Sequence, residues 1–416
     1  MTKLYIEGGR RLEGTVMVQG AKNSILPILA ASILPDGESV IENCPAISDT
    51  DVAIRILKGL GCSVSRESGV ITVNSENING YEIEDSLMRK MRSSIMFLGA
   101  IVAKTGRARI SMPGGCELGP RPIDLHLKAL EKLGAKIYDD RGYLECSCEG
   151  GLRGTEINLS FPSVGATENI MLAAATAKGT TVITNAAREP EIDDLKRFLN
   201  EMGAKISSDG GQMVIEGVKR LYPAVHRVIP DRIVASTYLA AIAATGGRGK
   251  LIGVEPMHFS SVISTLSDAG ADVRWSNDTV EIRTNGRLKG IRNLRTMPYP
   301  GFPTDAQAPL MALLTCAKGD SVFVETIFEN RFKHVNELIR MGAKITVQDR
   351  VAVVEGVQRL TGARVESTDL RGGAALVVAA LAAEGRTEID NVFHIDRGYE
   401  AIEEKLASLG ADIKRI

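Results

Sequence analysis

Residues 341–345 read Met-Gly-Ala-Lys-Ile, and close copies of this pentapeptide occur at five other places in the chain. The six copies contain Gly61, Gly134, Gly203, Gly270, Gly342 and Gly410. They lie roughly 70 residues apart, and the same order of elements precedes each one, which indicates an internally repeated structural unit. The sequence therefore predicts six copies of one unit.

Each unit begins with an Ala-rich apolar run such as residues 306–317, followed by a short strand such as residues 179–184. An amphipathic helix such as 192–202 then ends at the motif glycine. A strand over the Ala-Lys-Ile segment and a returning strand such as 213–217 complete the unit. We expect the first helix to be buried on all sides, since it is apolar nearly all round, and the second helix to face solvent.

The two ends of the chain complement each other. The sixth unit stops at Ile416 without its last strand, whereas residues 4–12 match the closing strands at 215–221 and 354–360. We expect the N-terminus to complete the sixth unit. This predicts one discontinuous domain (1–20 plus 230–416) and one inserted domain (21–229), each α/β with buried helices inside and sheets outside.

Composition and charge exclude several classes of partner. The chain has 416 residues and a formal charge of −1, so no overall field recruits nucleic acid or an acidic membrane. The longest apolar runs fall short of the ~18 residues that a membrane span needs. The N-terminus carries charges where a signal peptide has an apolar core, and six cysteines without a Cys-x-x-Cys pair suit a reducing compartment. We expect a cytoplasmic protein with neither nucleic-acid nor membrane partners.

Four cations stand where buried helices are expected to begin: Lys22, Arg92, Arg232 and Arg371. A cation at a helix N-terminus opposes the helix dipole. An anionic ligand would remove that conflict, because cations and free backbone N–H groups then act together. We infer that the cleft between the two domains binds polyanions.

Other ligand signatures are missing from the sequence. There is neither a Gly-x-x-x-x-Gly-Lys-Ser/Thr loop nor a Gly-x-Gly-x-x-Gly fingerprint. The five histidines show no metal-ligand spacing with one another or with cysteine. We therefore expect no metal and no cofactor.

The segment 111–126 reads Ser-Met-Pro-Gly-Gly-Cys-Glu-Leu-Gly-Pro-Arg-Pro-Ile-Asp-Leu-His. Its glycines and prolines exclude regular structure as far as Pro122, which suits the first position of a helix. Cys116 therefore lies on a loop, beside Arg121 and a helix start, where features that lower the pKa of a thiol are combined. This pattern favours a functional cysteine over a packing residue.

These features belong to a series of motifs that resembles the UDP-N-acetylglucosamine 1-carboxyvinyltransferases over the whole chain. The motifs occupy residues 20–24, 91–94, 113–116, 119–122, 163–167, 187–190, 230–232, 301–305, 329–332, 368–371 and 394–398. The sister family, the 5-enolpyruvylshikimate-3-phosphate synthases, shares the six-unit fold but is not expected to carry the Pro-Gly-Gly-Cys loop.

The resemblance implies two inside-out α/β barrels and a specific reaction. The enolpyruvyl group of phosphoenolpyruvate would be transferred to the 3-hydroxyl of UDP-N-acetylglucosamine with release of phosphate. This addition–elimination through a tetrahedral intermediate would be the first committed step of peptidoglycan synthesis. Both substrates are small molecules, and no cofactor is implied.

The resemblance also implies roles for individual residues. Cys116 would be the acid or nucleophile that fosfomycin alkylates, Asp305 the base, and Lys22 and Arg397 further catalytic groups. The phosphoenolpyruvate site would contain Lys22, Asn23, Arg92, Arg121, Arg371 and Arg397. The UDP-N-acetylglucosamine site would contain Asn23, Arg92, Arg121, Pro122, Ile123, Asp124, Leu125, Ser163, Val164, Gly165, Asp305 and Ile327.

Two alternatives remain open. One is a sister enolpyruvyl transferase that uses another acceptor, and the other is a UDP-sugar sensor without catalysis. Cys116 and Asp305 argue against the sensor, which would need neither. The oligomeric state is not predicted. At Cys116 we favour acid catalysis over an obligatory covalent adduct, because attack of the sugar on protonated phosphoenolpyruvate needs no bond to the enzyme, but the sequence does not decide between the two.

Overall fold

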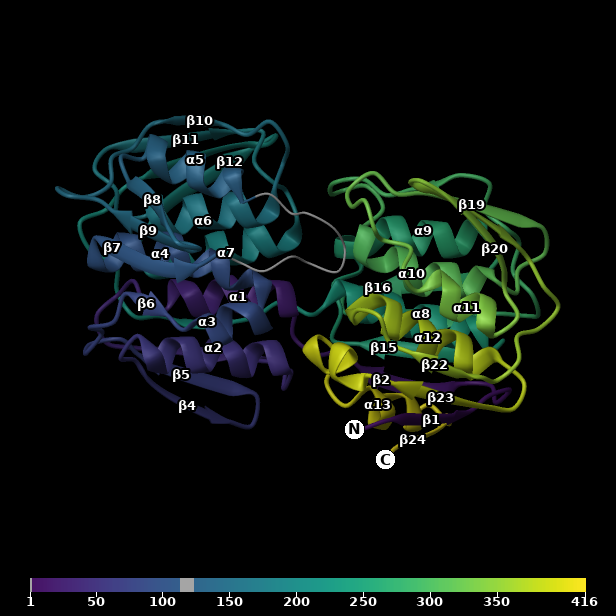
Figure 1. The fold of residues 1–416 in the computed structure, drawn as a ribbon. Helices are drawn as coiled ribbons and strands as arrows, with labels where there is room; N and C mark the ends of the chain where they lie inside the picture. Colours follow the sequence, from purple (N-terminus) through teal and green to yellow (C-terminus); the bar gives the residue numbers. More distant parts are fainter. Residues whose placement is uncertain (1, 113–122) are drawn as a thin grey trace. The chain divides into compact units, whose positions relative to one another are not determined.

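The computed structural model describes residues 2–112 and 123–416 (Figure 1). The described chain forms two compact domains. The discontinuous domain contains residues 2–19 and 230–416, and the inserted domain contains residues 20–112 and 123–229. Each domain has its own hydrophobic core.

The inserted domain contains three copies of the repeated unit. Their elements are α1 (Lys22–Ala31), β3 (Glu38–Glu42), α2 (Ser48–Gly59), β4 (Ser63–Glu67) and β5 (Val70–Asn74); α4 (Phe97–Thr105), β7 (Arg107–Ser111), α5 (Asp124–Lys132), β8 (Lys136–Asp140) and β9 (Tyr143–Ser147); α6 (Val164–Ala174), β11 (Thr180–Thr184), α7 (Pro190–Glu201), β12 (Lys205–Asp209) and β13 (Gln212–Glu216). A short helix α3 (Asp85–Lys90) and a 3₁₀ helix (Arg92–Met96) precede α4.

The discontinuous domain repeats the same order. Its elements are α8 (Arg232–Ala244), β15 (Arg248–Ile252), α9 (Ser260–Asp268), β16 (Asp272–Ser276) and β17 (Thr279–Arg283); α10 (Thr304–Leu314), β19 (Asp320–Val324), α11 (Val335–Arg340), β20 (Lys344–Gln348) and β21 (Val351–Glu355); α12 (Leu370–Ala382), β23 (Arg386–Asp390), α13 (Ile402–Ala407) and β24 (Asp412–Arg415). Two 3₁₀ helices cover Pro256–Phe259 and Val392–Arg397.

The motif glycine explains why the pentapeptide recurs. Gly203 follows the end of α7 with a φ of 95°, and the other five motif glycines have φ between 95° and 100°. A helix commonly ends on a residue in this left-handed conformation, which glycine adopts without a steric penalty from a Cβ atom. Each glycine therefore stops the second helix of its unit and turns the chain into the next strand.

The sheets have one more strand than the sequence pattern predicts. Among the described residues there are six sheets of four strands. The additional strands are β2 (Glu13–Met17), β6 (Glu82–Ile83), β10 (Glu156–Asn158), β14 (Val225–Arg227), β18 (Leu294–Arg295) and β22 (Arg364–Glu366). Each one pairs in parallel with the first strand of another unit, so that the three units of a domain form a closed ring.

The N-terminus completes the sixth unit, as predicted. The strand β1 (Leu4–Glu7) lies between β23 and β24 and is antiparallel to both. The sixth sheet therefore has the order β22-β23-β1-β24.

The first helix of every unit is buried, as predicted. α8, for example, is buried along nearly its whole length, from Arg232 to Ala243, and Figure 1 shows α8, α10 and α12 in the centre of their domain. The helices pack closely because small residues face each other. A Cβ atom on Gly99 of α4 would lie 2.4 Å from the carbonyl oxygen of Asn169 on α6, so this helix contact requires glycine.

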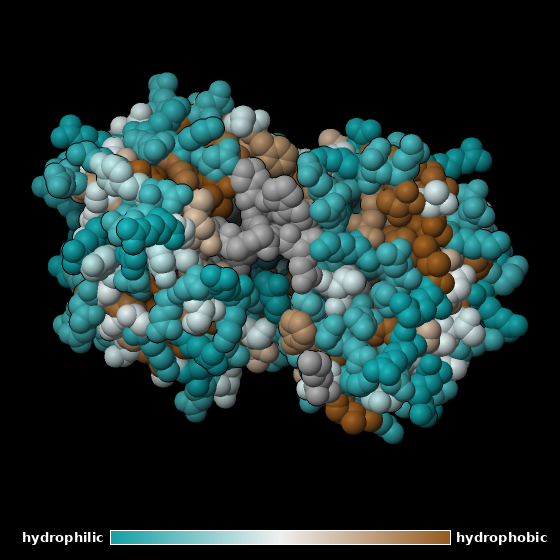
Figure 2. Space-filling view, viewed as in Figure 1, coloured by the Kyte–Doolittle hydropathy of each residue, from teal (hydrophilic) through white to brown (hydrophobic). Residues whose placement is uncertain are grey.

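The viewed surface is largely hydrophilic, with small apolar patches (Figure 2). No helix within residues 2–112 and 123–416 is both long and apolar enough to cross a bilayer.

Candidate active site

The predicted base lies at the start of a buried helix of the discontinuous domain. Asp305 is the second residue of α10. Its Oδ1 accepts a hydrogen bond from Nη2 of Arg331 at 2.8 Å, and its Oδ2 accepts from Nε and Nη2 of Arg371 at 3.3 and 3.1 Å. The side chain of Asp305 is 26% exposed, whereas each arginine is only 3% exposed. The carboxylate therefore reaches solvent while its two cations are buried behind it.

Arg371 connects the first turns of α10 and α12 and, through Tyr399, reaches the second turn of α8. It is the second residue of α12, and its Nη1 donates to the hydroxyl of Tyr399 at 3.3 Å. That hydroxyl also lies 2.8 Å from Oγ1 of Thr237 on α8. Burial opposes the charge on Arg371, but Asp305 and Tyr399 outweigh it and raise the pKa of this guanidinium. Arg371 therefore remains a cation between the first turns of α10 and α12.

Asp369 caps α12 and keeps its negative charge inside the domain. Its Oδ1 accepts from the backbone N–H groups of Arg371 and Gly372, both at 3.0 Å. Burial alone would raise the pKa of Asp369, but Arg331 and the bond from Gly372 lower it below its ordinary value. Asp231 caps α8 in the same way, with Arg232 as the first residue of that helix.

Arg331 is a site residue that the sequence analysis missed, although its motif was noted. It lies in the loop after β19 and also donates to the backbone carbonyl of Thr304 at 3.1 Å. Its partner Asp305 is 26 positions away, and a single sequence gives no signal for such a pairing. The only signal for Arg331 in the sequence is its place in the motif 329–332 of the resemblance.

The same loop is anchored to the start of α10. The buried Glu325 accepts hydrogen bonds from Oγ1 of Thr304 at 2.9 Å and from the backbone N–H of Ile327 at 2.8 Å. Ile327, a predicted nucleotide-sugar contact, is half-buried. Glu325 therefore holds Ile327 close to the helix turn that carries Asp305.

His334 is completely buried beside this cluster. Neither of its ring nitrogens makes a hydrogen bond. Burial, with Arg331 adding to it, lowers the pKa of His334 to about 4, and Asp369 only partly offsets the shift. The imidazole is therefore uncharged at neutral pH.

Arg397 ends the 3₁₀ helix Val392–Arg397 and is half-buried. The turn that follows it is held by Gln19, whose Nε2 donates to the carbonyl of Gly398 at 3.2 Å. The backbone N–H of Glu400 donates back to Oε1 of Gln19 at 2.8 Å. Gln19 thus fixes the backbone next to Arg397.

In the inserted domain, Lys22 is the first residue of α1 and is buried in an ion pair. Its Nζ lies 2.7 Å from Oδ2 of Asp49, and the two side chains are 8% and 2% exposed. Asn23 beside it is half-buried. The sequence analysis did not predict the partner Asp49, so Lys22 has a structural role in addition to any ligand contact.

The structure brings together two groups of predicted nucleotide-sugar contacts. Ile123, Asp124 and Leu125 lie at the beginning of α5, and Ser163, Val164 and Gly165 at the beginning of α6. The two helix starts meet at His126, because a Cβ atom on Gly165 would lie 3.1 Å from the His126 ring. Nδ1 of His126 also lies 2.8 Å from Nδ2 of Asn169 on α6.

Other predicted site residues lie outside the described residues. These are Cys116, Arg121 and Pro122, together with the side chain of Arg92. Their proposed roles stay predictions.

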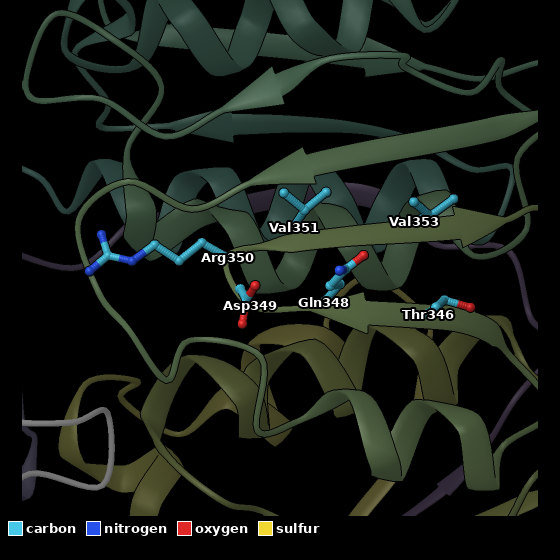
Figure 3. Close-up of a pocket in the computed structure, with 6 residues that line it drawn as sticks. All are labelled: Thr346, Gln348, Asp349, Arg350, Val351 and Val353. Carbon is cyan, nitrogen blue, oxygen red and sulfur yellow. The ribbon is translucent and has the colours of Figure 1, made fainter.

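A shallow hollow lies on the hairpin of β20 and β21 (Figure 3). It is lined by Thr346, Gln348, Asp349, Arg350, Val351 and Val353. None of the predicted site residues is among them. The structure also holds, within its described part, no group of three residues placed to bind a metal ion.

The chain is similar to known proteins in both sequence and fold. The family model for EPSP synthase (3-phosphoshikimate 1-carboxyvinyltransferase) matches residues 6–406. The crystal structure of the enolpyruvyl transferase NikO from Streptomyces tendae has a TM-score of 0.90 at 27% identity, over 100% of this chain and 98% of that one. An EPSP synthase from Acinetobacter baumannii shares the fold, with a TM-score of 0.77 at 19% identity over both complete chains. The class is therefore that of the enolpyruvyl transferases.

Full-length relatives narrow the class to one family. The chain is 53% identical to UDP-N-acetylglucosamine 1-carboxyvinyltransferase 2 of Caldanaerobacter subterraneus subsp. tengcongensis and 51% identical to the protein of that name in Carboxydothermus hydrogenoformans. Both alignments cover 100% of each chain. The chain belongs to the family of the UDP-N-acetylglucosamine 1-carboxyvinyltransferases, which confirms the resemblance seen in its motifs.

Proposed function

We propose that the protein transfers the enolpyruvyl group of phosphoenolpyruvate to the 3-hydroxyl of UDP-N-acetylglucosamine and releases phosphate, the first committed step of peptidoglycan synthesis. The observation that carries this proposal is the identity of 53% over the whole length of a UDP-N-acetylglucosamine 1-carboxyvinyltransferase. The partners are thus two small molecules, and a cytoplasmic location stays a prediction.

The reaction needs an acid and a base. When the methylene carbon of phosphoenolpyruvate gains a proton, its central carbon becomes electrophilic and the sugar hydroxyl adds to it while losing its own proton. The tetrahedral intermediate then breaks its bond to the phosphate oxygen and loses a proton from the new methyl group. Phosphate and the enolpyruvyl ether are the products.

Asp305 is the proposed base for the sugar hydroxyl. Its carboxylate is the partly exposed member of the cluster, and both of its oxygens are oriented by buried arginines. Such fixed partners give a catalytic group its direction before substrate arrives. Cys116 is the proposed acid that gives a proton to the methylene carbon.

The proposed role of the cations is to stabilise the negative charge of the tetrahedral intermediate. It carries a carboxylate and a phosphate together, so several fixed positive groups stabilise it better than one. Arg371 is one of these proposed positive groups, together with Lys22, Arg92, Arg121 and Arg397, and the uncharged amide of Asn23 is a further proposed contact. In the structure Arg371 already donates to Asp305 and Tyr399, so it links the proposed base to the proposed anion site.

One assay separates the candidate functions. Phosphate release from phosphoenolpyruvate is measured with UDP-N-acetylglucosamine and, separately, with shikimate 3-phosphate. Release with the nucleotide sugar alone is the expected result. Release only with another acceptor would indicate a sister transferase. Binding of the nucleotide sugar without any phosphate release would indicate a sensor.

A further inference from the structure

A buried carboxylate of the inserted domain joins segments that are distant in the sequence. Asp194 lies on α7, and its side chain is fully buried. Oδ1 accepts from Nη2 of Arg197 at 2.9 Å and from Nε2 of His226 at 3.2 Å. Oδ2 accepts from the hydroxyl of Ser24 and from the backbone N–H of Ile229 at 3.2 Å. Four donors occupy all the lone-pair positions that a carboxylate offers.

Two of these donors, Ser24 and Ile229, hold the first turn of α1 in place. Ser24 is the third residue of that helix, directly after Lys22 and Asn23. The residue before the helix, Ala21, provides no side-chain cap, and its backbone N–H donates to the carbonyl of Ile229 at 2.8 Å. Because Asp194 holds both Ser24 and Ile229, it fixes this turn from two directions.

His226 and Arg197 compensate the buried charge of Asp194. The ring of His226 also lies 2.7 Å, through Nδ1, from Oε2 of Glu201. Both partners of the ring are carboxylates, which only accept hydrogen bonds, so the ring satisfies both only when both nitrogens are protonated. A cation next to Asp194 offsets the cost of burying its charge.

We infer that Asp194 is a positioning residue for phosphoenolpyruvate binding, acting through its bonds to Ser24 and Ile229 on the turn that presents Lys22 and Asn23. The inference rests on the proposed function, in which those two residues contact that substrate. Asp194 itself touches no substrate. A displacement of about 1 Å at a substrate-holding group can lower the rate by about a hundredfold, so small movements of this turn matter.

The test replaces Asp194 by a side chain of the same shape. Asp194→Asn removes the charge and two of the acceptor positions. The matched control is Asp193→Asn, the preceding residue of α7, whose exposed carboxylate bonds to Lys196 at 2.6 Å. At a temperature where every variant is folded by circular dichroism, we expect the KM for phosphoenolpyruvate to rise about tenfold in Asp194→Asn. In the control it should change by less than about twofold.

Ser24→Ala provides a second measurement that does not alter the buried charge. It removes the hydroxyl that donates to Oδ2 of Asp194. Both substitutions therefore disturb the same hydrogen bond, so their effects on the KM should not add in the double variant. If Asp194→Asn does not fold, Ser24→Ala alone decides the question through the same KM.

Two results would overturn the inference. One is a KM for phosphoenolpyruvate that matches the control in Asp194→Asn and Ser24→Ala, even with a lower unfolding midpoint, since that is the behaviour of a purely structural residue. The other is strict additivity in the double variant. A wild-type protein that releases no phosphate is a different result, which refutes the proposed function without involving any variant.

Discussion

Oδ2 of Asp305 accepts two hydrogen bonds from the guanidinium of Arg371, from Nε at 3.3 Å and from Nη2 at 3.1 Å. The pair joins the first turn of α10 to the first turn of α12. Both donors hold the one oxygen Oδ2, and the bond from Arg331 to Oδ1 fixes the second oxygen, so the orientation of the carboxylate is restricted as well as its position.

Asp305→Asn should reduce turnover by about a hundredfold or more, in the range expected for loss of a general base. UDP-N-acetylglucosamine should still bind, because the other predicted nucleotide-sugar contacts are unchanged. Steady-state phosphate release and calorimetric titration with the nucleotide sugar measure the two effects separately. A rate within about tenfold of wild type would remove Asp305 from the chemistry.

Lys22→Ala and Arg397→Ala should differ in their effect on stability. Lys22 is paired with the buried Asp49, and breaking a buried pair from one side costs about 3–5 kcal/mol. Arg397 is half-buried at the end of a 3₁₀ helix, so its loss should affect phosphoenolpyruvate use more than folding. Urea unfolding and KM values for both variants check this contrast. An unfolding midpoint of Lys22→Ala equal to that of wild type would show that the Lys22–Asp49 pair contributes nothing to stability.

His226 should make the protein less stable as the pH rises. Burial opposes its charge, but Asp194 and Glu201 outweigh burial and raise its pKa above the ordinary value of 6.5. The folded protein then binds the proton more tightly than the unfolded chain, so the stabilisation is complete below about pH 6.5 and is lost as the pH passes the raised pKa. The difference in urea midpoint between wild type and His226→Gln should shrink over that range. A difference that stays constant from pH 6 to 9 would contradict the prediction.

His334 should act in the opposite direction. Its pKa is lowered to about 4 in the folded protein, while the unfolded chain titrates near 6.5. Between these values the unfolded chain binds more protons, so stability falls as the pH drops from about 6.5 to about 4, by on the order of 3 kcal/mol. Acid unfolding of His334→Gln, compared with wild type, measures this contribution. Nitrogen NMR of the imidazole should also show a neutral ring at pH 5.5, and a protonated ring there would refute the assignment.

Cys116→Asp should resist alkylation by fosfomycin and keep measurable activity. A thiolate attacks an epoxide carbon far better than a carboxylate does, whereas either group can deliver a proton. The experiment compares phosphate release and the gain in protein mass for wild type, Cys116→Asp and Cys116→Ala. An inactive Asp variant that binds both substrates would indicate obligatory covalent catalysis. Labelling of another cysteine in wild type would exclude Cys116 as the target.

The repeated fold could be predicted from sequence because its signals are local. Each motif glycine ends a helix in a left-handed conformation, and the buried helices are apolar over about three turns. Apart from β2, the fourth strands of the sheets were missed because they have only two or three residues, such as Glu82–Ile83. So short a segment cannot show an alternating pattern.

The candidate site also contains residues that could be predicted from sequence and residues that could not. Lys22 and Arg371 could be selected because a cation at a helix start is unfavourable without a partner. Arg331, Glu325 and Tyr399 could not, since each acts through a residue between 21 and 162 positions away. Such pairs depend on how the units close into a ring, and no local pattern records that closure.

The place of β1 between β23 and β24 has a consequence for the order of assembly during synthesis. The strand β1 leaves the ribosome long before its two partners, which both lie beyond residue 385. The inserted domain is complete by residue 229, and domains fold as units while the chain is still growing. Residues 4–7 therefore stay without their sheet until β23 and β24 have been made, long after the inserted domain is complete.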